Sequence, residues 1–335
     1  MDRLTEFFKK YNDIFNHDLI NFVKSVVPNN DIQMQEIFYY HLGLLENKKN
    51  QGKRIRPMLV LLCSEGAGAD WQSAIPAAIA VELIHNFSLI HDDIEDNGIK
   101  RRGKDAVWVK WGLPIGLNAG DAMFAAAFHA MNGLAGFCNP KIYQIAQGLL
   151  SATCMRLTYG QHLDLSFEQN ENVSITDYYQ MIEGKTAALF ACCAQLGAII
   201  GEKFAEETEK YYDFGRYLGM TFQIYDDWLG IWGEPELTGK SSNSDLIEGK
   251  KTIPVLIGLK NSQRFLQRWK KGPILLSETI EISDWLKEDG VELLVKREFT
   301  QWNKKLISEL EKMDCEQSVK IALRELADLM ITRKK

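Results

Sequence analysis

The sequence predicts an all-α fold organised as one domain. Almost every apolar segment repeats at the spacing of a helix, and none shows the sustained alternation of a strand. Of the 335 residues, 46% are hydrophobic, which is ample for a sizeable core. Neither a linker of disordered composition nor an internal repeat interrupts the chain. A single domain over residues 1–335 is therefore the economical interpretation.

The helices can be placed in order along the chain. Helical periodicity is expected over 3–27 (one helix or two), 32–47, 58–66, 74–97, 114–136, 142–164, 174–200 and 206–231, with short helices from 253 to 335. Pro76 falls in the first turn of the 74–97 helix, where proline is tolerated. Ser174-Ile175-Thr176-Asp177 has the capping-box pattern that opens a helix. A basic turn at 52–57 and a mobile loop at 233–251 are expected between helices.

The overall composition excludes several classes of protein. A net charge of −6 and a pI near 5.7 argue against a general nucleic-acid binder. The first residues are acidic and lack the apolar core of a signal peptide, and the longest apolar run, 187–200, is too short to span a bilayer. Six cysteines show no metal-binding spacing and are typical of buried thiols in a reducing compartment. We expect a cytoplasmic protein without a transmembrane segment.

Two acidic clusters end two of the apolar helices. Asp92 and Asp96 are four residues apart and share one helix face, and Asp93 and Glu95 flank that face. Four carboxylates within five residues repel one another unless a cation or protons compensate. A lone cluster would be interpreted as a solvated helix end, but a second pair, Asp226-Asp227, ends another apolar helix. Two such clusters on facing helices could hold several Mg²⁺ ions and a diphosphate between them.

Isolated cations complement these clusters. Lys53, Arg54 and Arg56 follow a glycine in the basic turn, and arginine suits a bidentate grip on phosphate. Lys185 lies on an apolar helix stripe, where it either reaches outward or faces an anion. Each cation alone would be a solvated surface group. Together with two acidic clusters they favour a site for two polyanionic substrates.

Two further polar residues share helix faces with the aspartates. His85 is seven residues before Asp92, which is two helical turns, so a phosphate contact competes with a purely structural role. Gln223 precedes Asp227 by four residues and lies on its side of the helix.

The motifs form an ordered set over about residues 50 to 255. The set consists of Gly52-Lys53-Arg54-Ile55-Arg56-Pro57, Glu82-Leu83-Ile84-His85, Leu89-Ile90-His91-Asp92-Asp93-Ile94-Glu95-Asp96, Arg101-Arg102-Gly103, Asn118-Ala119-Gly120-Asp121, Gly160-Gln161 with Asp164, Gly184-Lys185-Thr186, Phe222-Gln223-Ile224-Tyr225-Asp226-Asp227, and Thr238-Gly239-Lys240 to Gly249-Lys250-Lys251-Thr252-Ile253-Pro254. This set resembles the trans-isoprenyl diphosphate synthases (the polyprenyl synthetase family). Its motif form is closest to the geranylgeranyl and farnesyl diphosphate synthases.

The resemblance implies a fold and a reaction. The fold is the isoprenoid-synthase helical bundle, whose central cavity is lined by the two acidic motifs. The reaction is head-to-tail 1'-4 condensation of isopentenyl diphosphate onto an allylic diphosphate. The implied catalytic residues are Asp92, Asp96, Lys185, Asp226 and Asp227. Asp92, Asp96 and Asp226 would bind three Mg²⁺ ions.

The resemblance also implies how each substrate is held. The residues that would contact the allylic diphosphate or its metals are Arg101, Lys185, Thr186, Gln223, Lys240 and Lys250. The residues that would hold isopentenyl diphosphate are Lys53, Arg56, His85 and Arg102. One position departs from the family pattern, because Gly230 replaces the third aspartate of the usual second motif. Either Asp245 substitutes for it or two carboxylates suffice.

In this family, the residues just before the first acidic motif form the floor of the tunnel in which the product grows. Ser88 lies one turn before Asp92 on the same side, and Phe87 is next to it. One bulky and one small residue suggest a C20 (geranylgeranyl) or C15 (farnesyl) product. Alternatively, Phe87 packs in the core, and length is set by residues Val81, Met123 or Phe124.

Two other functions were weighed against this prediction. A class I terpene cyclase would also ionise an allylic diphosphate but needs no isopentenyl site, so Lys53, Arg56 and Arg102 argue against it. A non-catalytic subunit of a hetero-oligomeric synthase is favoured only by Gly230 and opposed by the intact first motif. By resemblance, we also expect a homodimer formed through the alanine-rich helix at 115–135.

Overall fold

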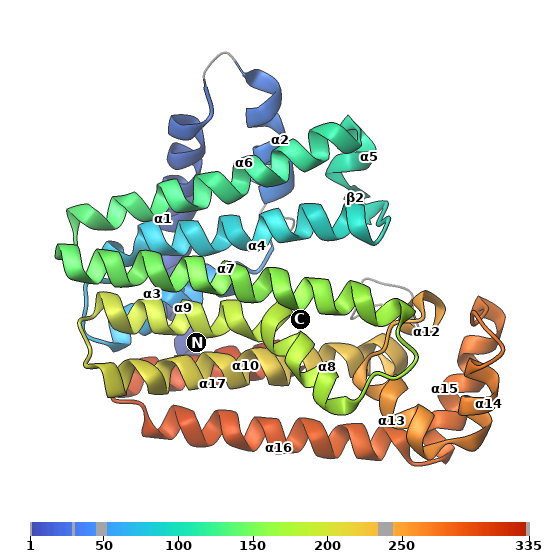
Figure 1. The fold of residues 1–335 in the computed structure, drawn as a ribbon. Helices are drawn as coiled ribbons and strands as arrows, with labels where there is room; N and C mark the ends of the chain where they lie inside the picture. Colours follow the sequence, from blue (N-terminus) through green and yellow to red (C-terminus); the bar gives the residue numbers. More distant parts are fainter. Residues whose placement is uncertain (1, 29–30, 45–51, 234–243, 333–335) are drawn as a thin grey trace. The chain divides into compact units, whose positions relative to one another are not determined.

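The computed structural model describes residues 2–28, 31–44, 52–233 and 244–332, and helices dominate it (Figure 1). The prediction of an all-α fold is therefore confirmed. The chain divides into two compact units. Unit 1 comprises Met1–Ala152, Cys192–Tyr211 and Met313–Glu325. Unit 2 comprises Thr153–Ala191, Tyr212–Lys312 and Leu326–Lys335.

Unit 1 holds the first acidic motif. Its elements are α1 (Arg3–Val26), α2 (Ile32–Leu42), α3 (Ile55–Gly66), the 3₁₀ turn η2 (Trp71–Ala74), α4 (Ile75–Glu95), β1 (Lys100–Arg101), β2 (Lys104–Asp105), α5 (Val107–Trp111), α6 (Leu113–Met131) and η3 (Asn132–Gly136). Helices α4 and α6 pack side by side (Figure 1). Helix α3 is buried almost all round, and α4 is buried until its last turns. The acidic end of α4 is therefore carried on a helix that its apolar residues fix in the core.

The short hairpin β1–β2 follows α4 and was not predicted. Lys100 pairs with Asp105 and Arg101 with Lys104 in an antiparallel register. The two turn residues, Arg102 and Gly103, both have positive φ, which is the geometry of the tight type I′ hairpin turn. Strands of two residues are too short to show a period in the sequence.

Unit 2 holds the second acidic motif. Its own elements are α8 (Ile175–Ile182), the π-helix η4 (Glu183–Ala187), α12 (Ser244–Glu248), α13 (Ile253–Asn261), α14 (Gln263–Trp269), η5 (Leu276–Glu278), α15 (Thr279–Glu288) and α16 (Val291–Lys312). Its core gathers apolar residues from many of these helices, Tyr178, Ile257 and Phe265 among them. The predicted capping box is present, because Ser174 and Asp177 bond reciprocally.

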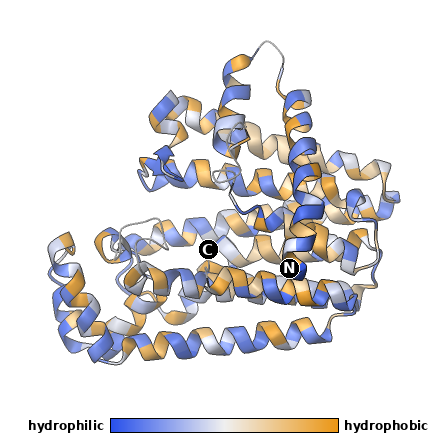
Figure 2. Ribbon diagram, turned by 180° about the vertical axis from the view of Figure 1, so that it is seen from behind, coloured by the Kyte–Doolittle hydropathy of each residue, from blue (hydrophilic) through white to orange (hydrophobic). Residues whose placement is uncertain are grey.

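Four helices have residues in both units. They are α7 (Pro140–Gln169), α9 (Ala188–Ile200), α10 (Ala205–Trp232) and α17 (Gln317–Thr332). Figure 2 shows hydrophilic and hydrophobic residues interleaved along most helices, as in amphipathic helices packed round a core.

Several predicted boundaries were wrong. The helix expected over 32–47 ends at Leu42, because Gly43 adopts the left-handed conformation that terminates helices. The helix expected over 174–200 is interrupted by η4. The loop expected over 233–251 contains α12 within its described part.

One helix of the described chain, Trp71–Glu95, is long and apolar enough to cross a membrane. However, 61% of its most apolar window is buried inside the fold. The segment is therefore consistent with the core helix of a soluble protein.

Candidate active site

The first acidic motif divides its aspartates between two environments. Asp93 is buried, and the guanidinium of Arg101 binds it through Nε (3.1 Å to each oxygen) and Nη2 (2.6 Å to Oδ1). Burial raises the pKa of Asp93, and Arg101 opposes that rise. Asp92 is half-buried, whereas Asp96 is exposed. Asp96 is the C-cap residue of α4, and its backbone N–H donates to the carbonyl oxygen of Asp92. The hairpin thus fixes the helix end through Asp93 and leaves the flanking carboxylates nearer the surface.

The four residues predicted to hold isopentenyl diphosphate come together in unit 1. Arg56 Nη1 lies 3.1 Å from His85 Nε2, so His85 accepts that hydrogen bond and carries its proton on Nδ1. Burial lowers the pKa of His85, and Arg56 and Arg102 lower it further. A Cβ placed on Gly52 would lie 3.5 Å from Cζ of Arg102, so the turn that carries Lys53 passes close to Arg102.

A small pocket adjoins this cation cluster. The residues that line it are Tyr40, His41, Arg101, Arg102, Lys104 and Asp105. Arg102 donates from Nη1 to the carbonyl oxygen of His41 at 3.2 Å, and Tyr40 donates to the carbonyl oxygen of Asp105. Burial, with Arg102 and Arg101 nearby, lowers the pKa of His41 to about 3. The imidazole is therefore neutral at physiological pH, and the positive charge of the pocket comes from its arginines and lysine.

In unit 2, Lys185 and Thr186 lie within the π-helix η4. Helix α7 crosses this element so closely that a Cβ on Gly160 would lie 2.0 Å from the backbone nitrogen of Lys185. A Cβ on Gly184 would likewise meet the α7 backbone at 2.8 Å, so both positions need glycine. Lys185 Nζ then lies 2.5 Å from Oδ2 of Asp164, one turn along α7 from Gly160. Single-turn π-helices are frequent at functional sites.

A chain of hydrogen bonds links η4 to the second acidic motif on α10. Thr186 Oγ1 donates to Gln223 Oε1 (2.7 Å), and Gln223 Nε2 donates to Asp227 Oδ1 (2.8 Å). Tyr178 Oη donates to the other oxygen of Asp227 at 2.7 Å. Asp227 is buried, and burial raises its pKa to about 8, with Asp245 adding to the rise. Asp226, by contrast, is half-buried.

Gly230 provides space for another carboxylate. A Cβ at Gly230 would lie 2.4 Å from Oδ2 of Asp245, which is carried on α12. The side chain of Asp245 therefore occupies the volume into which a side chain at position 230 would extend. Of the remaining predicted contacts, Lys250 pairs with Glu248 at 3.2 Å, and Lys240 lies outside the described residues.

The structure thus assembles the predicted residues as two groups, one in each unit. In unit 1, Arg56 contacts His85 on α4, and Arg101 binds Asp93 at the end of that helix. Arg102 follows Arg101 in the hairpin turn and lies close to Gly52. Unit 2 gathers Lys185, Thr186, Gln223, Asp226 and Asp227. Within the described ranges, no three His, Cys, Asp or Glu side chains converge as a ready-made metal site.

The sequence interpretation missed two contributions, which are the pairing of Arg54 with Glu82 and the hydrogen bond of Tyr178 to Asp227. Glu82 belongs to the motif set but was given no role, although it is the one acidic residue in the apolar stretch of α4 before Asp92. Nothing in the sequence distinguishes Tyr178 from other core tyrosines.

Two helix ends that carry aspartates, together with the arginines, lysine and neutral histidines of unit 1, are the arrangement expected of an enzyme that acts on polyanionic substrates. A family model described as polyprenyl synthetase matches residues 41–273. With that match covering well over half of the sequence, the chain belongs to the polyprenyl synthetase family.

Individual relatives agree with this assignment. The (2E,6E)-farnesyl diphosphate synthase of Mycobacterium tuberculosis is 41% identical over 245 residues, which cover 71% of this chain and 67% of the relative. The geranylgeranyl diphosphate synthase of Methanosarcina mazei is 38% identical over 285 residues, which cover 84% and 86%. The crystal structure of geranylgeranyl pyrophosphate synthetase from Pyrococcus horikoshii has a TM-score of 0.88 at 31% identity, covering 99% of this chain and 98% of that one.

Proposed function

We propose that this chain is a short-chain trans-prenyltransferase that joins isopentenyl diphosphate head-to-tail (1'-4) to an allylic diphosphate. The observation that carries the proposal is the cation group of Lys53, Arg56, His85 and Arg102 in unit 1. A second diphosphate substrate requires such a group, whereas an enzyme that only ionises one allylic diphosphate does not. The names of the relatives, which are all prenyl diphosphate synthases, support the same reaction.

The proposed metal ligands are Asp92, Asp96 and Asp226, with three Mg²⁺ ions per site. Their fit to Mg²⁺ is supported by chemistry, because carboxylate oxygens are hard ligands. The neighbours Asp93 and Asp227 are buried and already accept several hydrogen bonds, so the exposed and half-buried aspartates are the better candidates. Bound Mg²⁺ would supply positive charge to the diphosphate as its C–O bond breaks.

The side chains of the protein have separate tasks in this reaction. The proposed contacts of the allylic diphosphate are Arg101, Lys185, Thr186, Gln223, Lys240 and Lys250, with Asp227 holding Gln223 in place. These donors stabilise the negative charge of the leaving diphosphate. The cations of unit 1 hold isopentenyl diphosphate so that its alkene meets the allylic cation in an effectively unimolecular step. Apolar surroundings exclude water, and the released diphosphate accepts the final proton.

The proposed product is C20, with C15 as the alternative. The names of the relatives include both geranylgeranyl and farnesyl synthases. Phe87 contacts Phe124 edge-to-face with ring centroids 5.0 Å apart, and Phe124 in turn contacts Phe128 at 5.2 Å. Phe87 and the alternative candidate Phe124 therefore form one aromatic cluster one to two turns before the first motif. The adjacent Ser88 donates to the carbonyl oxygen of His85.

Replacing Phe87 with alanine should lengthen the product. The ring is the bulkiest group next to Ser88, and its removal shortens the aromatic cluster. Reverse-phase chromatography of the dephosphorylated products should show at least one additional C5 unit. Phe137→Ala, which removes an exposed ring elsewhere in unit 1, is the matched control and should leave the product unchanged. An unaltered product from Phe87→Ala would exclude Phe87 as a chain-length residue.

One assay distinguishes this function from the two alternatives. The protein is incubated with Mg²⁺, isopentenyl diphosphate and C5, C10 or C15 allylic diphosphates. Elongated prenyl diphosphate supports the proposal. A cyclic hydrocarbon formed without isopentenyl diphosphate would indicate a terpene cyclase. Inertness that ends only when a partner subunit is added would indicate a non-catalytic subunit.

The remaining features of the protein are also proposals. We propose that residues 1–335 form one catalytic domain and that the protein is a cytoplasmic homodimer without nucleic-acid partners. The proposed dimer contact is α6, whose exposed apolar residues Leu117 and Phe124 support a protein contact. Analytical ultracentrifugation of the wild-type protein and of Leu117→Glu tests this assembly.

A further inference from the structure

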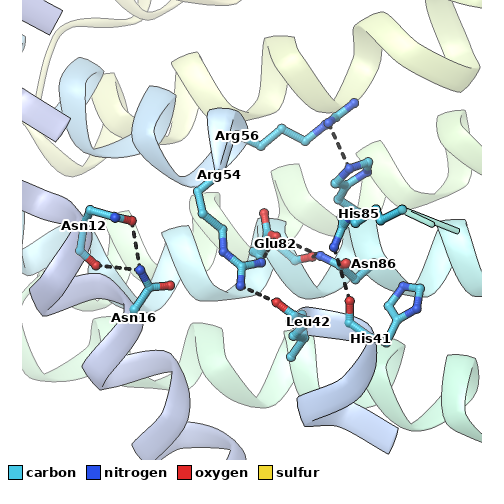
Figure 3. A network of polar contacts seen from close by, with 10 residues as sticks. Asn12, Asn16, His41, Leu42, Arg54, Arg56, Glu82, His85 and Asn86 are labelled. Atoms are coloured by element: carbon cyan, nitrogen blue, oxygen red, sulfur yellow. Dashed lines mark hydrogen bonds and ion pairs between the residues drawn. The ribbon is translucent and has the colours of Figure 1, made fainter. Parts of the chain in front are cut away.

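A buried ion pair lies directly behind the proposed isopentenyl diphosphate site. Arg54 Nη1 is 2.5 Å from Glu82 Oε1, and the two side chains are only 2% and 4% exposed (Figure 3). Arg54 has a φ of 48°, in the left-handed region that non-glycine residues rarely adopt. A buried charge is costly unless its partner is well placed, so both residues are held in one arrangement.

Arg54 also connects three elements of unit 1. It precedes α3 as its N-cap residue, it pairs with Glu82 on α4, and its Nη2 donates to the carbonyl oxygen of Leu42 at 2.5 Å. Leu42 is the last residue of α2, where unpaired carbonyls carry partial negative charge. Arg102 donates to the preceding carbonyl, that of His41. Two guanidinium groups therefore bind successive carbonyl groups at the end of one helix.

The neighbours of Arg54 are the proposed substrate cations. Lys53 precedes it, and Arg56 follows two residues later. On α4, Glu82 and His85 are three residues apart, so they lie on the same helix face. Arg54 bonds the first and Arg56 bonds the second, as Figure 3 shows. The ion pair thus fixes the register between the start of α3 and the face of α4 that carries His85.

The positive charge of Arg54 is compensated inside the fold. Glu82 pairs with Arg54, and its carboxylate also interacts electrostatically with Arg56 and Arg102. Asn86 Nδ2 donates to Oε1 of Glu82 at 2.9 Å, so a second polar group orients the carboxylate.

We propose that Arg54 and Glu82 are positioning residues for isopentenyl diphosphate. They act through Lys53 and Arg56 and do not touch the substrate. This inference rests on the proposed function, because it assumes that those cations bind isopentenyl diphosphate.

Glu82→Gln separates positioning from simple electrostatics. The variant removes a negative charge next to the cation group and keeps the shape of the side chain. If Glu82 acted only through its charge, the KM for isopentenyl diphosphate would fall. If Glu82 positions Arg54, that KM should rise about tenfold, because small misplacements of binding groups are costly. The KM for the allylic diphosphate should stay within about twofold.

A double variant guards against misfolding. Replacing one partner leaves the other buried and unpaired, whereas Arg54→Met with Glu82→Leu removes both charges and is expected to fold. It should show the same selective rise in KM, weaker binding of isopentenyl diphosphate by titration calorimetry, and faster amide hydrogen exchange at the start of α3. Tyr11→Phe, which removes the partly buried hydrogen bond to Glu65 in the same unit, is the control and should show none of these changes.

The outcomes distinguish the two proposals. Wild-type protein that consumes no isopentenyl diphosphate would refute the proposed function. An active wild type whose folded double variant has an unchanged KM for isopentenyl diphosphate would refute the positioning role alone. Equal rises in the KM of both substrates would also refute it, because they would indicate general loosening of the fold.

Discussion

The two acidic helix ends bury one aspartate each but compensate it differently. At the end of α4, Asp93 is paired with the cation Arg101. At the end of α10, Asp227 receives hydrogen bonds from the neutral groups of Tyr178 and Gln223, and its pKa is raised to about 8. The carboxylate of Asp93 is therefore stabilised by an ion pair, and that of Asp227 by hydrogen bonds from uncharged donors.

In both motifs, two consecutive aspartates have different environments and different roles. Neighbouring residues on a helix point about 100° apart, so they cannot both face one ligand in the same way. In each motif the buried aspartate organises the adjoining segment, which is the β1–β2 hairpin for Asp93 and η4 for Asp227. The other aspartate, Asp92 or Asp226, remains nearer the surface.

The largest expected effect is on the less buried aspartates. Asp92→Ala and Asp226→Ala should each lower kcat/KM by more than about 10³-fold, because each removes a carboxylate that we propose as a ligand of Mg²⁺. Neither change should unfold the protein, and circular dichroism should be unaltered. The measurement is turnover at saturating Mg²⁺. Substantial residual activity in either variant would remove the metal-binding role from that residue.

The buried aspartates should differ from each other in stability. Asp93→Asn breaks a charged pair with Arg101 and should lower the free energy of unfolding by about 2 kcal/mol. Asp227→Asn should cost less than about 1 kcal/mol, because a tyrosine hydroxyl can accept as well as donate a hydrogen bond. Urea unfolding of both variants gives the two values. Equal losses would mean that the contrast between the partners has no energetic consequence.

An effect smaller than that of Asp93→Asn is expected on the pH dependence of stability, through His41 and the arginines beside it in unit 1. The pKa of His41 is about 3 in the folded protein, against 6.5 as its ordinary value. Because the unfolded state binds a proton that the folded state does not, stability is complete above the ordinary pKa and is lost as pH falls below it. Between about pH 7.5 and about pH 5.5, His41 should account for about 1.4 kcal/mol of lost stability.

The measurement is chemical denaturation at both pH values for wild type and for His41→Gln. The variant cannot take up this proton, so its loss over the same interval should be smaller by that amount. An identical loss in the two proteins would contradict the burial of a neutral imidazole.

Much of the fold was predictable because it depends on local chemistry. The capping box at Ser174 and the apolar helix before Asp92 follow from side-chain spacing alone. The hairpin and the π-helix were missed, because the first is too short for a period and the second depends on the close crossing of Gly160 and Gly184.

The candidate site was predictable as a set of residues, but of its pairs only Gln223 with Asp227 followed from helix spacing. Its residues come from recognisable motifs. The pairs of Arg54 with Glu82, Asp93 with Arg101 and Asp227 with Tyr178 are set by tertiary packing, since the two members of each pair lie on different elements. Sequence spacing cannot distinguish a carboxylate that pairs with another side chain inside the fold from one that faces a ligand.

The space beside Gly230 has a consequence for protein engineering. Writing a third aspartate into the α10 motif looks like a simple repair, yet the new side chain would collide with the carboxylate of Asp245. The side chain of Asp245 must rotate away to admit it. A swap of the α10 motif between relatives therefore also changes the position of a carboxylate on α12.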